Sequence, residues 1–407
     1  MQSLSSPLNL QPAAPRLWRR HYVPAAVVLA ALAAPCAAQS AAQFVVSTSN
    51  DPGAISPQLP ALDDTDLMIV GGGALPAPWF GVEHWLAVTD FAPRDVDALG
   101  FLGDEPRAGD FYTSFQSDEG GFKDGDVVLL RADGTLAAVI DEESIALALG
   151  DAALDIDVDA LCFEGGGPLG GGRMLFSLAD NATSPTLGAL LDGDVLELSN
   201  TGSVQRLFTE AEVSAAFAAA TGTATAVGDV LGLELVSGEV WASVQSPTSH
   251  DGGVIALGAF ARVIVQESEL ALAGEELDAF ALLRSAPMPC VWFETNVGTY
   301  DGRGAIQHGT PNGPMLVLAA GASGWIEAPL FGGFGAVALS GSDPLLNALL
   351  GGANLPIAVV GANGALEKPV SFDASAAGSG PGGTLGISVQ VIDLVTLRTS
   401  PPFRITP

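Results

Sequence analysis

A short sequence pattern recurs four times along this chain, and it limits the fold more than any other feature. The pattern is D-x-D-A-L-x-F, which is complete at Asp95–Phe101 and Asp157–Phe163. Looser copies occur at residues 229–233 and 276–282. A single copy of such a unit cannot bury its apolar face, so neighbouring copies must pack against one another. The sequence therefore predicts a repeat architecture: a propeller, a solenoid or an array.

Two further patterns accompany the first in a fixed order. One is a strand-like segment that ends near a serine, and successive serines are 67, 63 and 66 residues apart. These serines are Ser47, Ser114, Ser177 and Ser243. The other pattern is D-x-[DG]-[VL] followed by apolar residues, and its copies begin at Asp64, Asp124, Asp192 and Asp251. Its repeated Asp-Gly pairs indicate turns, because a feature that recurs in every unit is normally structural.

Each unit is expected to contain four short β-strands. In the unit that begins at Asp157 they are Asp157–Phe163, Arg173–Leu178, Asp194–Leu198 and Val204–Phe208. Thr209 and Glu212 have the spacing of a capping box and predict that a helix follows the fourth strand. Four antiparallel strands per unit correspond to one blade of a β-propeller.

The first strand of a unit has two unlike faces. Ala98 and Gly100 lie on one face, whereas Asp97, Leu99 and Phe101 lie on the other, because side chains alternate along a strand. A strand with one small and one large apolar face suits the innermost position of a blade, where neighbouring blades converge. We therefore expect this strand to line the centre of the domain.

The order of the copies predicts how the repeat domain closes. The chain enters the repeats with the second pattern, near Phe44, and leaves them after a copy of the first pattern, near Leu282. The two ends together would complete one blade, so an all-β, four-bladed propeller-like domain is the favoured fold. The alternatives are a five-bladed ring that also uses Val291–Ile306 and a stacked β-array.

The first forty residues have the layout of an export signal. A basic segment with Arg16, Arg19 and Arg20 precedes the apolar run Val23–Ala34, and small residues follow up to a cleavage site before Gln39. Such a run is too short to span a bilayer, which takes about 17–25 residues. The sequence leaves open the general secretory or the twin-arginine route. Export to the periplasm, the cell surface or the medium is expected, with no transmembrane segment after cleavage.

Three segments follow from these observations. They are a signal peptide at residues 1–38, a β-propeller-like repeat domain at 39–286, and a C-terminal domain at 287–407 with a Pro-rich entry. Short β-like runs predict that the last domain is a small β-sandwich. The runs are Met315–Ala319, Gly335–Leu339, Ile357–Val360, Pro369–Phe372 and Gly386–Leu394.

The charge of the chain excludes one class of partner. Lys and Arg total 15 against 46 Asp and Glu, and the net charge is -31. A surface this negative repels nucleic acid and anionic lipid but attracts cations. Export would permit a disulfide between Cys162 and Cys290, but two buried apolar residues are the slightly favoured interpretation.

The layout resembles the exported, Ala- and Gly-rich repeat proteins of planctomycete-type bacteria, which carry D-x-D-A-L repeats and a short C-terminal β domain. The resemblance covers residues 44–407 by architecture. It implies export and a β fold, and it brings no catalytic residues to this chain.

The alternating Asp155, Asp157 and Asp159 are the one candidate metal site. Carboxylate oxygens suit Ca²⁺, although the glycine and glutamate of an EF-hand loop are missing. The competing and favoured interpretation is that Asp157 and Asp159 cap turns at the start of a strand. No cofactor is otherwise expected, with Ca²⁺ as the open alternative.

Other motifs point to no chemistry. The histidines that follow the signal are scattered, Ser323 misses the G-x-S-x-G spacing, and the Gly165–Gly172 run lacks the lysine of a phosphate loop. Five tryptophans could stack on sugars but are better explained as core residues. They are Trp79, Trp85, Trp241, Trp292 and Trp325.

An extracellular binding or structural protein is therefore expected, more readily than an enzyme. Its ligand, a glycan or a protein, is not identified, and no catalytic residue is assigned. The alternative is a secreted propeller-type hydrolase that acts on polysaccharide. Such an enzyme needs two carboxylates roughly 5–9.5 Å apart at the axis of the ring. A deep axial funnel lined by acidic residues would favour this alternative.

Overall fold

The structure is a computed structural model of the 407-residue chain. It describes residues 43–48, 66–71, 76–89, 91–101, 111–131, 134–165, 172–247, 250–270, 277–283, 289–296, 300–327, 332–333, 336–351, 355–372, 374–379 and 385–406. The predicted signal peptide and its cleavage site lie outside these residues, as does the predicted domain boundary at residue 286. No helix in the described part of the chain is long and apolar enough to cross a bilayer.

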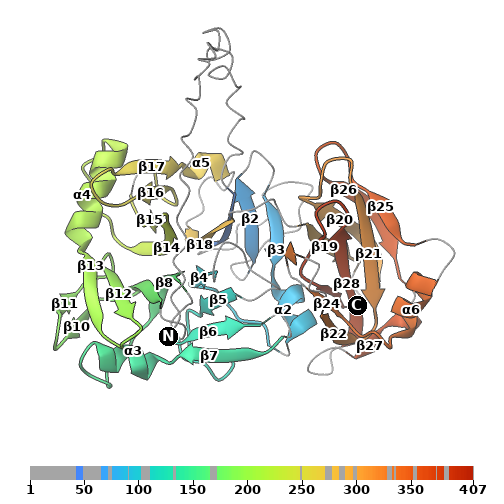
Figure 1. Ribbon diagram of the computed structural model, residues 1–407, viewed down its shortest axis with the longest axis horizontal. Helices are drawn as coiled ribbons and strands as arrows, with labels where there is room; N and C mark the ends of the chain where they lie inside the picture. Colours follow the sequence, from blue (N-terminus) through green and yellow to red (C-terminus); the bar gives the residue numbers. More distant parts are fainter. Residues whose placement is uncertain are drawn as a thin grey trace, which may run out of the picture. The chain divides into compact units, whose positions relative to one another are not determined.

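Four four-stranded antiparallel sheets form the first part of the fold (Figure 1). From the innermost strand outwards, the first contains β18 (Leu277–Leu283), β1 (Gln43–Thr48), β2 (Leu67–Gly71) and β3 (Ala77–Phe80). The second contains β4 (Ala98–Gly100), β5 (Phe111–Ser114), β6 (Val127–Leu130) and β7 (Leu136–Ile140). The third contains β8 (Val158–Glu164), β9 (Arg173–Leu178), β12 (Val195–Ser199) and β13 (Val204–Phe208). The fourth contains β14 (Val230–Val236), β15 (Glu239–Val244), β16 (Val254–Ala256) and β17 (Arg262–Val265). The predicted four strands per unit are confirmed.

The first sheet combines the two ends of the repeat region, as predicted. Strand β18 pairs antiparallel with β1, so that Val45 lies opposite Ala281 and Ser47 opposite Ala279. The innermost strands contact one another in the order β4, β8, β14 and β18, and β18 also contacts β4. This cycle of contacts is what a four-bladed propeller-like fold requires. Closure of the ring in solution stays a prediction, and deletion of residues 44–90 would test it.

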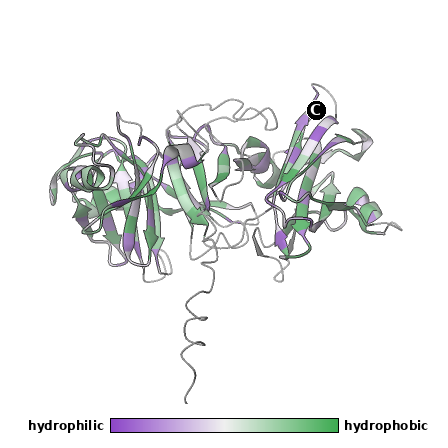
Figure 2. Cartoon of the chain, turned by 90° about the horizontal axis from the view of Figure 1, so that it is seen from above, coloured by the Kyte–Doolittle hydropathy of each residue, from purple (hydrophilic) through white to green (hydrophobic). Residues whose placement is uncertain are grey.

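Small residues of one innermost strand pack against large residues of the next. A Cβ atom added to Gly100 would lie 2.4 Å from Cδ1 of Leu161, and one added to Gly232 would lie 2.4 Å from Cδ1 of Phe280. No side chain larger than hydrogen fits at either position without a shift of its neighbour. Four apolar cores result, one at each contact between neighbouring sheets. Figure 2 shows hydrophobic residues concentrated along the strands.

The serines of the repeat tie each sheet to the next one. The buried hydroxyl of Ser47 donates a hydrogen bond to the carbonyl oxygen of Val96 in the neighbouring sheet, at 2.9 Å. Ser114 and Ser177 donate in the same way to Val158 and Val230, at 2.5 and 2.7 Å. The near-constant serine spacing therefore records an inter-sheet hydrogen bond. Ser243 occupies the same place in the fourth sheet, but its hydroxyl has no hydrogen-bond partner within the described residues.

Helices follow the outermost strands: α2 (Val82–Val88), α3 (Glu142–Ala148), α4 (Glu210–Thr221) and α5 (Glu267–Leu270). The predicted capping box of α4 is present, since the Thr209 side chain accepts from the Glu212 backbone N–H. In the D-x-[DG]-[VL] pattern, the side chain of the second aspartate accepts a hydrogen bond from the first backbone N–H of the helix that follows. Asp126 binds Glu142 in this way, and Asp194 binds Glu210, both at 2.8 Å. The Asp-Gly turns thus have a structural role.

A β-sandwich follows the four sheets. One sheet contains β19 (Cys290–Thr295), β20 (Asp301–Gln307) and β26 (Leu366–Ser371), and the other has the order β23-β29-β28-β21-β25. The second sheet is formed by β21 (Pro314–Ala320), β23 (Gly332–Gly333), β25 (Ile357–Val359), β28 (Leu385–Asp393) and β29 (Arg398–Thr399), with β27 (Gly378–Ser379) and β30 (Phe403–Ile405) paired to β28. The remaining described elements, apart from a 3-10 turn, are two strand pairs and a helix. One pair is formed by β22 (Ser323–Glu327) and β24 (Ala336–Leu339), the other by β10 (Ala182–Ser184) and β11 (Gly188–Leu190), and the helix is α6 (Pro344–Gly351).

Side chains from both sheets of the sandwich fill one core, as its architecture requires. The segment of the five-bladed alternative, Val291–Ile306, pairs through β20 with β26 and so belongs to the sandwich. The sandwich and the four sheets are parts of one compact unit, Ala41–Pro407. Cys162 and Cys290 lie buried in two different cores and are not joined by a disulfide.

The inter-sheet hydrogen bonds predict a contrast between two serines. Ser177→Ala should lower the free energy of unfolding by about 1–3 kcal/mol, because the buried Val230 carbonyl loses a donor. Ser243 is equally buried but has no such partner in the described structure, so Ser243→Ala is the matched control and should change the free energy by less than about 0.5 kcal/mol. Chemical denaturation measures both. Equal losses in the two variants would contradict this role of the repeated serines.

Deletion of residues 44–90 tests closure of the ring. It removes no complete repeat but takes β1, β2 and β3 away from β18. If the ring is closed, the shortened chain should aggregate or lose cooperative unfolding, because strand edges and an apolar sheet face become exposed. Size-exclusion chromatography and thermal unfolding measure the outcome. A soluble chain that still unfolds cooperatively would support an open array instead.

Candidate functional site

Acidic side chains from three of the four sheets meet at the centre of the innermost strands. They occupy the second acidic position of the D-x-D-A-L pattern and are Asp97, Asp159 and Asp278. In the fourth sheet Leu231 occupies the equivalent position. We refer to Asp97, Asp159 and Asp278, together with Asp95, as the axial carboxylates. All four residues are buried.

A β-bulge sets this position apart in the sheets. Val158 pairs with Leu178 and Ala160 with Ser177, so Asp159 is the extra residue between them. The same shift leaves Leu231 and Asp278 without a partner in the ladder. A bulge bends the strand and re-aims the side chain of its extra residue. It therefore allows a carboxylate to leave the sheet face and turn toward the centre.

The axial carboxylates lie close together and away from water. One oxygen each of Asp95, Asp97 and Asp278 lies within 4.8 Å of the others. Only 3% of Asp97 is exposed, and 6% each of Asp159 and Asp278. Innermost strands that face each other across the centre, β8 with β18 and β4 with β14, are also in contact. The centre is thus narrow at this level and holds no wide channel between the described strands.

The electrostatic environment disfavours charge on these groups. Burial, with repulsion from Asp157 and three other carboxylates, raises the pKa of Asp97 to about 9. Burial also raises the pKa of Asp159 well above its usual value, and Asp229, Asp97, Asp278 and Asp157 add to this effect. All of the charged groups that act on Asp97 and Asp159 in this way are carboxylates. The arrangement can hold protons or a cation.

The three predicted metal ligands lie in different surroundings. Strand β8 begins at Val158, so Asp155 and Asp157 precede it and do not alternate along it with Asp159. Asp159 is an axial carboxylate, while the exposed Asp155 lies with Asp124 and Glu142 in a second acidic cluster. Asp157 lies between them in sequence and is half-buried; burial, with repulsion from Asp124, raises its pKa to about 7. The structure therefore brings Asp159 together with residues far away in sequence.

The second acidic cluster contains its own cation. The ammonium group of Lys123 lies 2.7 Å from the carboxylate of Glu142. The Asp124 carboxylate accepts from the backbone N–H of Gly125 at 2.9 Å. Its charges are thus partly satisfied by protein groups.

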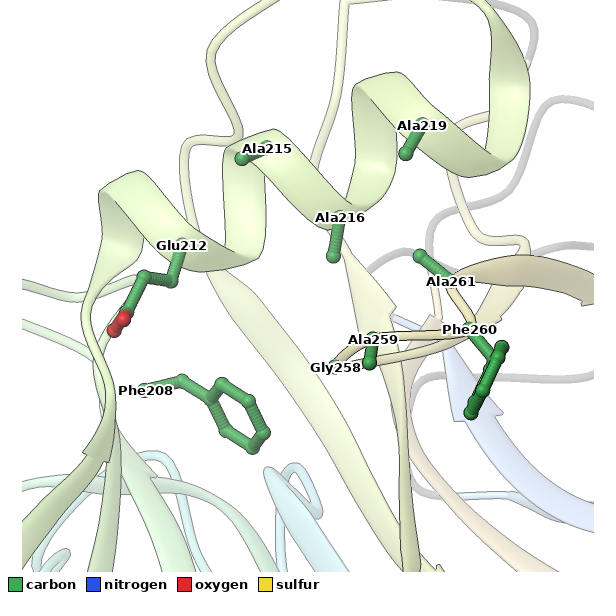
Figure 3. A pocket seen from close by; sticks show the side chains of 9 residues that line it. All are labelled: Phe208, Glu212, Ala215, Ala216, Ala219, Gly258, Ala259, Phe260 and Ala261. Carbon is green, nitrogen blue, oxygen red and sulfur yellow. The ribbon is translucent and has the colours of Figure 1, made fainter.

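A second feature that the sequence did not reveal is an apolar groove of about 410 Å³ between α4 and the loop that joins β16 to β17. Ala216 and Ala219 of α4 point toward this loop, and Ala215 also lines the groove, with Phe208 at one end and Phe260 at the other (Figure 3). Phe260 is 83% exposed. Only the folded chain brings the helix, the loop and Phe208 together.

The tryptophans whose side chains are described lie in an apolar core or pack against one. Trp79, Trp85 and Trp292 are buried, and the half-buried Trp241 donates its indole N–H to Glu239 at 2.9 Å. The side chain of Trp325 and most of the Gly165–Gly172 run lie outside the described residues. The buried tryptophans therefore offer no surface for sugar stacking.

Comparison with protein-family models finds no match, and neither does comparison with curated proteins. Among solved structures, the chain is similar to dihydro-heme d1 dehydrogenase NirN in complex with DHE, at 14% identity and a TM-score of 0.22. The match covers 90% of this chain and 64% of NirN. A likeness this weak transfers no residue role.

The histidines do not form a metal site in the described structure, and His84 instead packs between two parts of the fold. Its ring stacks on Phe80 at 5.4 Å and meets the edge of Phe403 at 5.1 Å. Its Nδ1 accepts a hydrogen bond from the backbone N–H of Gly81 at 3.0 Å. Burial lowers the pKa of His84 to about 3. The folded state thus keeps this imidazole neutral.

A pH dependence of stability follows from His84. Above pH 6.5 the imidazole is neutral in both states, and it makes no pH-dependent contribution. Between pH 6.5 and about 3 the unfolded chain binds a proton that the folded chain excludes, so stability should fall as the pH falls. The slope from one such group is at most about 1.4 kcal/mol per pH unit. His84→Asn should flatten the curve of unfolding free energy against pH, and parallel curves for the two proteins would contradict the assignment.

Proposed function

We propose that this chain is an exported binding or structural protein whose propeller-like domain serves as an interaction platform. The export signal in the sequence supports its location outside the cytoplasm. The net charge of -31 favours neutral or basic ligands over anionic ones. The proposed ligand is a glycan or a protein with an apolar contact face.

The burial of the axial carboxylates carries this proposal. A polysaccharide hydrolase needs two carboxylates that reach the bond to be cleaved, one of them as an acid and the other as a base or nucleophile. Asp97, Asp159 and Asp278 expose 6% or less of their surface, and the innermost strands that face each other across the centre are in contact. Carboxylates buried in this way do not line an open acidic funnel, which is the feature that would favour a hydrolase.

The groove beside α4 supplies a surface suited to binding. Its lining is mainly alanine, glycine and phenylalanine, and it opens to solvent next to the exposed ring of Phe260. Exposed aromatic rings commonly contribute much of the binding energy at interfaces. Glu212 is the one charged residue in the lining, and it is engaged with Thr209 at the start of the helix. The groove therefore presents an apolar contact without a competing catalytic group.

The proposal predicts binding without turnover. The mature protein should bind members of a glycan or protein array and should release no sugar from a parallel panel of polysaccharides. Phe260→Ser should weaken binding roughly tenfold, which is the effect of losing a moderate contact residue. Leu147→Ser is the matched control, because Leu147 is 66% exposed on α3 and lies outside the groove.

Two results would contradict the proposal. One is hydrolysis of a polysaccharide by the wild-type protein that is lost in Asp97→Asn or Asp159→Asn. The other is an array on which no ligand binds above background. Equal binding by wild type and Phe260→Ser would exclude the groove as the contact surface.

A further inference from the structure

We propose that Asp97, Asp159 and Asp278, together with Asp95, bind one Ca²⁺ ion at the centre of the four sheets. The site joins residues from three sheets: Asp159 and Asp278 are the extra residues of bulges, whereas Asp95 and Asp97 come just before β4. This proposal does not depend on the proposed binding function. It replaces the alternating triplet of the sequence with a set that shares only Asp159 with it.

The distances fit a calcium ion. Ca²⁺ binds six to eight oxygens at about 2.3–2.6 Å, so two oxygens on one ion lie at most about 5 Å apart. One oxygen each of Asp95, Asp97 and Asp278 lies within 4.8 Å of the others. Asp159, from the third sheet, lies outside this group of three, but the charges of Asp97 and Asp278 act on it and its Oδ2 is buried without a partner among the described residues. Three carboxylates thus already offer oxygens for much of a calcium shell, and the proposal includes Asp159 as the fourth ligand.

Unsatisfied oxygens provide an independent observation. One carboxylate oxygen, Oδ2, of Asp97 and the same oxygen of Asp159 have no hydrogen-bond partner among the described residues. Both side chains are more than nine-tenths buried. A buried polar atom without a partner is costly, and a carboxylate is costlier still when it is charged. A cation at the centre would satisfy these oxygens and offset the repulsion between the carboxylates.

The chemistry of the ligands selects the ion. The site consists of carboxylate oxygens without sulfur or imidazole, and such hard ligands suit Ca²⁺ rather than Zn²⁺. The ligands come from three separate segments of the chain, the residues before β4, strand β8 and strand β18, and Ca²⁺ tolerates such irregular coordination better than Mg²⁺ does. A bound ion would link the first, second and third sheets, so its loss should weaken the whole domain.

The second acidic cluster serves as an internal comparison. Asp124, Glu142 and Asp155 also place their oxygens within 4.8 Å of one another. This cluster, however, has the Lys123 ammonium group 2.7 Å from Glu142, and Asp155 is exposed. The protein itself thus neutralises part of its charge and water reaches it, and Asp155→Asn is therefore the matched control.

Calcium titration of the chelator-treated mature protein tests the site. Isothermal titration with CaCl₂ should give one ion per chain. Saturating Ca²⁺ should raise the melting temperature by on the order of 5 °C beyond NaCl at the same ionic strength. Asp97→Asn and Asp159→Asn should each weaken Ca²⁺ binding at least roughly tenfold, whereas Asp155→Asn should bind as the wild type does.

The variants also separate a lost ligand from a damaged fold. Without Ca²⁺, Asp97→Asn should melt at the same temperature as the wild type or higher, because the amide keeps the shape of the side chain and is neutral without binding a proton. Equal shifts in CaCl₂ and NaCl would overturn the proposal. So would calcium binding that survives in both Asp97→Asn and Asp159→Asn, or that is lost in Asp155→Asn.

Discussion

The close approach of four innermost strands is the constraint on which the rest of the structure depends. Where these strands converge, Gly100 contacts Leu161 and Gly232 contacts Phe280, with no space for a further methyl group. Interiors packed this tightly tolerate few changes of volume. The alternation of small and large residues along the repeat is therefore a packing requirement, and it fixes which face of each sheet meets its neighbour.

The same convergence accounts for the unusual chemistry at the centre. The D-x-D-A-L pattern places an aspartate one residue before the small–large alternation, and at Asp159 and Asp278 a bulge takes that aspartate out of the ladder. Repetition then brings three such residues near one another at the centre, where burial raises the pKa of Asp97 to about 9. Leu231 interrupts the repetition in the fourth sheet. Acidic groups gathered in this way are costly unless protons or a cation neutralise them.

The burial of these carboxylates also helps to distinguish a catalytic role from a structural one. A catalytic pair must face its substrate, whereas a structural cluster is best kept from water. The axial carboxylates have the second arrangement, and the exposed apolar contact lies elsewhere, beside α4 and Phe260. The acidic centre of the domain and the apolar groove proposed to bind a ligand are therefore at different places in the fold.

The amino-acid sequence by itself determined the repeat, the four strands of each unit, the capping box at Thr209 and the pairing of the two ends of the repeat region in one sheet. These features depend on local periodicity and on the order of the copies, which can be read along the chain. The tertiary structure alone decided that Asp97, Asp159 and Asp278 meet while Asp155 does not join them, and that Ser177 has an inter-sheet partner whereas Ser243 has none in the described structure. The reason is physical: residues more than fifty positions apart in the sequence come together only through the packing of separate sheets, and single-residue bulges alter the direction of Asp159 and Asp278.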